Sequence, residues 1–144
     1  MDALRREVGR DLWNDAQLSD AEFTVLAHLH SNDEEGVRPA QCARAIGWDS
    51  SRLAHQLRRL EKRGLVETRP AGGEDGRATL SRLTPEGRTL YRRAIGPHLD
   101  SARRWFADGL TGEELDGLEK SLDSLLSHIR RTAETNTEAE KKDS

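Results

Sequence analysis

The chain has 144 residues, of which 34% are hydrophobic and 34% are charged. That length suits one domain with one main core, and the polarity suits a helical protein with much exposed surface or a subunit that completes its core with a partner. There is no run of about 18 apolar residues, and the N-terminal residues lack an apolar signal region, so we expect neither a membrane span nor secretion. The single cysteine, Cys42, cannot form an intramolecular disulfide and fits a cytoplasmic location.

Charge is segregated along the chain, although the net charge is only −3. Residues 1–37 carry three Arg against nine acids, a net of −6. Residues 38–93 carry thirteen Lys or Arg against six acids, a net of +7, and residues 94–144 carry seven against eleven, a net of −4. A basic middle between acidic ends indicates a polyanion partner, with solvated surface arginine as the alternative.

Two helices are predicted before residue 32. The first, over residues 3–14, is indicated by apolar residues spaced four apart: Leu4, Val8 and Leu12. The second begins after Ser19, because Glu22 follows three residues later and completes a capping-box pattern. Polar residues then interrupt the apolar pattern at 32–36.

A helix pair and a hairpin are predicted in the basic middle. Pro39 marks a helix start and Gly47 its end, and Asp49 can cap the next helix, over residues 50–63. The apolar stripe of that helix must face the core and consists of Leu53, Leu57 and Leu60. The runs "LVETRP" and "ATLSRL" alternate apolar and polar side chains as strands do, and the turn chemistry of "AGGEDG" joins them.

Further helices are predicted in the last third of the chain. Thr84 caps one that Gly96-Pro97 should kink or break, and Thr111 caps a last helix that ends at residue 131. Residues 132–144 are predicted to be a disordered tail.

Two short helices followed by a hairpin form a winged helix-turn-helix pattern, whose second helix can enter a DNA major groove. We therefore expect a mainly α fold with a small β-hairpin wing, in which a winged-helix region at 19–84 is flanked by helices over 1–18 and 85–131. The candidate DNA-binding residues are Arg38, Ser50, Ser51, Arg52, His55, Gln56, Arg59, Asp75 and Arg77.

These candidates are expected to divide by role. The Ser, Arg, His and Gln side chains from Ser50 to Gln56 are of the types that reach base edges in the major groove. Arg59 and Arg38 are expected at phosphates, and Arg77 in a minor groove, with Asp75 orienting an arginine. The alternative is an ordinary surface helix whose arginines pair with Glu61 or Glu67, followed by a solvent-exposed turn.

The order of these elements resembles the MarR family of winged-helix transcriptional regulators over residues 3–131. The motifs that carry the resemblance are "RLEKRGLV", the Asp75-x-Arg77 step of the wing, and "LTPEG" at 83–87. The resemblance implies a homodimer on pseudo-palindromic DNA, with Ser50–Arg63 as the recognition helix. It places the dimer contacts on the first helix and the two C-terminal helices.

Apolar faces suited to those contacts are present on the predicted helices. Such leucine-rich helices in so polar a chain need a surface against which to bury them. The residues expected there are Leu4, Val8, Leu12, Leu99, Trp105, Phe106, Leu115, Leu118, Leu122, Leu125 and Ile129. The chain departs from many family members in its short first helix and in Gly96-Pro97. Both departures affect any effector pocket, to which no residue is assigned.

Three single residues have competing interpretations. Cys42 lies near Arg38 and Arg44, which would favour a reactive thiolate, but a small buried cysteine is the stronger expectation. Trp48 is expected to pack under the recognition helix rather than to stack on a base. The histidines show no metal-ligand spacing, so neither a metal nor a cofactor is expected.

The prediction is a cytoplasmic, sequence-specific transcriptional regulator, a repressor by default, that acts as a homodimer and that a small-molecule effector could release. No catalytic arrangement is present in the sequence, so an enzyme is not expected. Two alternatives stay open: an architectural DNA binder, and a protein-interaction module built on a degenerate winged helix.

Overall fold

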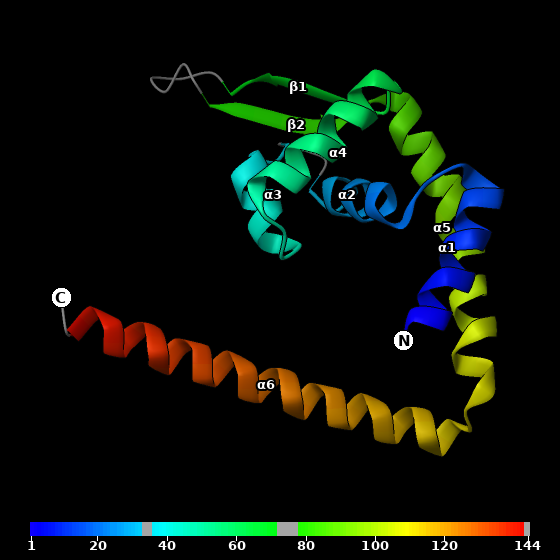
Figure 1. The fold of residues 1–144 in the computed structure, drawn as a ribbon, viewed down its shortest axis with the longest axis vertical. Coiled ribbons are helices and arrows are strands. Elements are labelled where there is room, and N and C mark those ends of the chain that lie inside the picture. The colour runs from blue at the N-terminus through cyan, green and yellow to red at the C-terminus, as the bar shows by residue number, and fades with distance from the viewer. Residues whose placement is uncertain (33–35, 72–77, 143–144) are drawn as a thin grey trace. The chain divides into compact units, whose positions relative to one another are not determined.

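A computed structural model describes residues 1–32, 36–71 and 78–142 of the chain. In chain order the elements are α1 (Asp2–Ala16), α2 (Asp20–His30), α3 (Pro39–Ala45), α4 (Ser50–Lys62), β1 (Val66–Pro70), β2 (Thr79–Leu83), α5 (Pro85–Trp105), the 3-10 turn η1 (Ala107–Gly109) and α6 (Gly112–Lys142) (Figure 1). The chain divides into two compact units, Met1–Ala102 and Arg103–Ser144. The mainly helical winged-helix prediction is confirmed.

Helix starts follow the predicted caps. The Ser19 hydroxyl accepts a hydrogen bond from the Glu22 backbone N–H, and the Glu22 carboxylate accepts one from the Ser19 N–H, which is a complete capping box. Asp49 caps α4 by accepting from the Arg52 N–H at 2.8 Å. Gly64 follows α4 with a φ of 70°, a left-handed conformation that glycine adopts without steric cost.

Strands β1 and β2 form the predicted antiparallel hairpin, with Val66 opposite Leu83 and Pro70 opposite Thr79. Val37 adds a bridge to Ser81 and so joins the segment before α3 to the wing. Of the turn predicted at 71–76, residues 72–76 lie outside the described residues, and the Ala71 N–H donates to the Ala78 carbonyl at 2.8 Å.

The core of the first unit lies between the helix pair, the base of the hairpin and the helices that flank them. In that unit α4 contacts α2, α3 and β1. The predicted stripe of α4 is buried as expected, since Leu53, Leu57 and Leu60 are at most 6% exposed. The remaining core residues are Leu12, Ala16, Leu18, Phe23, Val25, Leu26, Leu29, Val37, Cys42, Ala43, Leu65, Val66, Leu83 and Ala94.

Two helices extend further than the sequence predicted. Helix α5 runs through Pro97 without ending there. Pro97 lies on the exposed side of the helix, so the Arg93 carbonyl that loses its partner can be hydrated instead. Helix α6 continues to Lys142 rather than stopping at 131. From Leu118 to Lys142 the sequence has no Gly or Pro and is rich in Leu, Glu, Lys and Arg, which favour a helix.

Within the described ranges, no helix has both the length and the apolar character needed to cross a membrane.

Candidate nucleic-acid interface

The N-terminal end of α4 presents a row of polar side chains. Ser50, Ser51, Arg52 and His55 are exposed, while the leucines on the opposite side of the helix are buried. Gln56 differs from this expectation, because it is half-buried and its Oε1 is covered, with no hydrogen-bond partner among the described residues. The pattern leaves one face of α4 open along its first two turns.

Asp49 determines which hydrogen-bonding groups are available at this end. Its carboxylate accepts from the Ser51 hydroxyl and from the Arg52 backbone N–H, and these bonds hold the pKa of Asp49 below its ordinary value. The Ser51 hydroxyl proton is thus engaged, and its oxygen retains its capacity to accept. The backbone N–H of Arg52 is also occupied, so a phosphate at this helix end would have to compete with Asp49.

Arg52 lies over the ring of Trp48. The guanidinium carbon is 4.0 Å from the ring centroid, which is a close cation–π arrangement. Trp48 is half-buried and packs against the core, which agrees with its predicted place under the recognition helix. The contact with Arg52 was not predicted, although the i, i+4 spacing of the two residues could have indicated it.

The C-terminal end of α4 is held by a buried carboxylate that the sequence analysis assigned only to helix capping. The side chain of Glu22 is fully buried, and its Oε1 lies 3.1 Å from Arg63 Nη1 and 3.8 Å from Arg59 Nε. Burial alone raises the pKa of Glu22, but hydrogen bonds from Ser19 and Arg63 outweigh it and hold the pKa below the ordinary 4.5. Arg59 was expected at a phosphate; it is half-exposed and already close to an acid within the protein.

The other candidates do not belong to α4. Arg38 is exposed at the N-cap position of α3. Asp75 and Arg77 lie outside the described residues. On β1, Arg69 pairs with Glu67 at 2.8 Å, so Glu67 does pair with an arginine, although that arginine is not on α4.

Helix α5 begins directly against the end of α4. The Thr84 hydroxyl donates to the Gly64 carbonyl at 2.7 Å and accepts from the Gly87 N–H at 3.0 Å. A Cβ on Gly87 would lie 2.0 Å from the Leu65 carbonyl oxygen, so only glycine allows this approach. These contacts account for Thr84 and Gly87 within the "LTPEG" motif.

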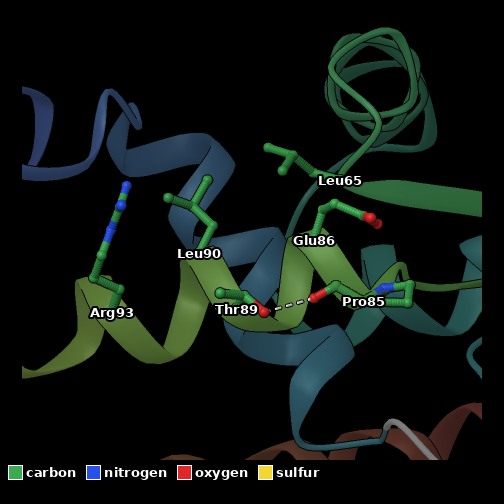
Figure 2. Close-up of a pocket in the computed structure, with 6 residues that line it drawn as sticks. All are labelled: Leu65, Pro85, Glu86, Thr89, Leu90 and Arg93. Carbon is green, nitrogen blue, oxygen red and sulfur yellow. Dashed lines mark hydrogen bonds between the residues drawn. The ribbon is translucent and has the colours of Figure 1, made fainter.

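A shallow pocket of about 430 Å³ opens beside this junction. Figure 2 shows its lining of Leu65, Pro85, Glu86, Thr89, Leu90 and Arg93, with the Thr89 hydroxyl bonded to the Pro85 carbonyl at 2.9 Å. The wall is apolar around Leu65 and Leu90, and Glu86 and Arg93 bring opposite charges.

The residues expected in a dimer fall into three groups. Leu12 is 1% exposed and lies in the core of this chain, so its side chain is covered without a partner. Leu4, Val8, Leu115 and Leu118 are half-buried. The other six expected residues are at least 41% exposed: Leu99, Trp105, Phe106, Leu122, Leu125 and Ile129.

A polar contact between α1 and α5 was not predicted. The hydroxyl of Ser101, which is 2% exposed, donates to Asp11 Oδ2 at 2.6 Å. The bond joins two helices that the sequence analysis assigned to dimerisation, and both residues belong to the first unit.

Comparison with known proteins agrees with this geometry. Residues 21–96 match the family model of a winged helix DNA-binding domain. The chain is 33% identical over 88 residues to the HTH-type transcriptional regulator PecS of Dickeya dadantii, covering 60% of this chain and 52% of PecS. The match thus spans about half the length of that relative.

Two solved structures from Streptomyces coelicolor are similar over most of the chain. AbsC, a MarR family transcriptional regulator, is 31% identical, with 89% of this chain and 88% of AbsC covered and a TM-score of 0.72. Sco3205, a MarR family transcriptional regulator in complex with DNA, is 27% identical, with 89% and 82% covered and a TM-score of 0.78.

The helix pair and hairpin of this chain therefore form a winged-helix DNA-binding domain. Taken with the close and nearly full-length similarity to AbsC, this domain shows that the chain belongs to the MarR family of transcriptional regulators.

Proposed function

We propose that the protein is a homodimeric repressor that binds pseudo-palindromic operator DNA through the exposed face of α4. The observation that carries the proposal is the division of α4 into a buried leucine side and an open side with Ser50, Ser51, Arg52 and His55. Serine, arginine and histidine are hydrogen-bonding partners for base edges. The structure of Sco3205 in complex with DNA supports the same use of the fold.

The remaining candidates take supporting roles in this proposal. Gln56 lies beside the major-groove residues, and Arg38 and the exposed part of Arg59 meet phosphates. Arg77 enters a minor groove, and Asp75 orients an arginine. Such a protein would act in the cytoplasm.

Dimer formation is supported by the exposed apolar side chains. Leu122, Leu125 and Ile129 recur at helical spacing on α6 and are 49%, 53% and 52% exposed. A second copy of the chain would cover such a stripe and place two recognition helices about 34–36 Å apart, one DNA turn. Sedimentation analysis should therefore give a dimer for the wild type, and replacing Leu122 and Leu125 with Lys should give a monomer. A wild-type monomer at all concentrations would contradict this part.

Release by a small molecule is proposed through the junction of α4 and α5. The Thr84 bonds tie the end of the recognition helix to the start of α5, so a shift of α5 moves α4 with it. A ligand would act only by binding one arrangement better than the other.

The deciding experiment measures binding to the DNA upstream of the protein's own gene and to a scrambled duplex, at about 150 mM salt. A preference of about a thousandfold is expected. Arg52→Ala should reduce that preference, while Arg92→Ala, an exposed arginine on α5, is the matched control. Equal binding to the upstream DNA and to the scrambled duplex would favour an architectural binder. No binding to either duplex would favour a protein-interaction module. Repression is checked by a reporter gene placed behind the bound DNA.

A further inference from the structure

The backbone and the ring of Trp48 are both held in place by their neighbours. Gly47 precedes it with a φ of 69°, and the Trp48 N–H donates to the Ala43 carbonyl at 2.9 Å. Its ring packs against the core cluster, and Asp49, the next residue, caps α4. The Trp48 ring is therefore held in a fixed position beside the N-terminal end of the recognition helix.

Arg52 lies on the Trp48 ring, and the N–H groups of its guanidinium remain available for hydrogen bonds. Its Cζ lies over the Trp48 ring, 4.0 Å from the ring centroid. A guanidinium that stacks on an aromatic face keeps its in-plane N–H groups available for hydrogen bonds, and the side chain of Arg52 is exposed. Within the described part of the chain, no acid pairs with the guanidinium of Arg52, and Asp49 accepts from the Ser51 hydroxyl and the Arg52 backbone N–H.

A guanidinium edge held in one orientation suits a particular base. Arginine reads guanine through two parallel bonds to O6 and N7, which need a defined plane and direction. An arginine without such support can turn to phosphates, which carry no sequence information. The geometry at Trp48 thus favours base reading over backbone contact.

We infer that Trp48 is a positioning residue for base specificity, which it confers by stacking on Arg52 and presenting its edge to a guanine. The inference rests on the proposed function, because it assigns Arg52 to the major groove. It predicts that removing the ring reduces discrimination between bases much more than it reduces affinity for DNA in general.

The test begins with wild-type protein and a pool of randomised duplexes, from which the preferred duplex is selected. Affinity is then measured for that duplex, for duplexes with each selected guanine replaced, and for scrambled DNA. Trp48→Leu should lose on the order of tenfold in preference at one guanine, the range expected for a bidentate arginine contact. Its affinity for scrambled DNA should change less than about twofold.

The double variant separates positioning from general support of the fold. If Trp48 acts through Arg52, then adding Trp48→Leu to Arg52→Ala should change the preference little further. Trp48→Phe retains an aromatic face and should keep part of the preference, and it serves as the test protein if Trp48→Leu does not fold. Thermal unfolding of each variant is measured alongside.

The outcomes distinguish failure of the proposed DNA-binding function from failure of the role assigned to Trp48. A wild type that selects no duplex overturns the proposed function, and the inference with it. A wild type that selects a duplex, with Trp48 variants that keep the same base preference, overturns the inference alone. So does an equal loss of affinity for selected and scrambled DNA that persists in the Arg52→Ala background.

Discussion

The carboxylate of Glu22 and the guanidinium of Arg63 are joined by a 3.1 Å hydrogen bond, although 41 positions separate them in the sequence. Glu22 also accepts from the backbone N–H and the hydroxyl of Ser19, at 2.9 and 3.0 Å. A single buried side chain therefore caps α2 and holds the end of α4. Because every one of these bonds is donated to the carboxylate, the site favours the ionised acid.

Glu22→Gln should destabilise the fold by about 2 kcal/mol, because the amide group replaces one acceptor oxygen with a donor that faces other donors. Chemical denaturation measures this, with the exposed Glu86→Gln as control, for which a change within about 0.5 kcal/mol is expected. The pKa of Glu22 is lowered in the folded state, so its contribution is present above pH 4.5 and is lost as the pH falls further. A deficit that stays constant into acid would contradict this account.

Gly87→Ala should cost about 3 kcal/mol, because the new methyl group would collide with the Leu65 carbonyl oxygen at 2.0 Å. The backbone atoms involved cannot turn aside as a flexible side chain would. Gly9→Ala in α1 is the control, since its Cβ would meet nothing within 4 Å and alanine favours a helix by about 0.5–1 kcal/mol. Similar melting temperatures for the two variants would show that α5 does not approach Leu65 so closely.

His98 should make the protein less stable in mild acid. Burial lowers the pKa of His98, and the attraction of Asp20 offsets only part of this effect. The ring centroids of His98 and Phe23 are 4.3 Å apart, and His98 Nδ1 is buried with no hydrogen-bond partner in the described residues. Since the unfolded chain binds the proton more readily, the free energy of unfolding should fall as the pH drops below 6.5.

Denaturation curves at about pH 8 and about pH 5.5 measure this loss. The loss should shrink in His98→Gln and persist in His128→Gln, which changes an exposed histidine on α6. Equal losses in both variants would place the titration on another group.

Cys42 should be inert toward thiol reagents in the folded protein. It is 1% exposed, and burial raises the pKa of its thiol to about 11, so only about one molecule in ten thousand is a thiolate at neutral pH. A chromogenic disulfide should react slowly with the native protein and rapidly after denaturation. Fast labelling of native protein would restore the redox sensor that Arg38 and Arg44 suggested from the sequence.

The local patterns predicted the fold well. The capping box at Ser19, the Asp49 cap and the leucine stripe of α4 each depend on residues close in sequence, and all three are confirmed. Pro97 and the C-terminal segment were judged from composition alone. Whether a proline faces solvent depends on packing, and a polar segment rich in helix formers can continue a helix already begun.

The candidate site was predicted less completely. Exposure of Ser50, Ser51, Arg52 and His55 follows from the helical period, and the structure agrees. The residues elsewhere in the chain that α4 contacts cannot be predicted from the helical period. Glu22 meets Arg63 only because α2 crosses the end of α4, and this contact depends on the tertiary fold.

The contact of Glu22 with two arginines also affects how DNA binding responds to ionic strength. Each cationic side chain that neutralises a phosphate releases counterions, so the salt dependence counts the charges that the protein delivers. Arg59 and Arg63 share one buried carboxylate, so these two arginines together deliver about one net positive charge rather than two. The slope of DNA affinity against salt concentration should therefore be shallower than if Arg59 and Arg63 were both fully available to phosphates.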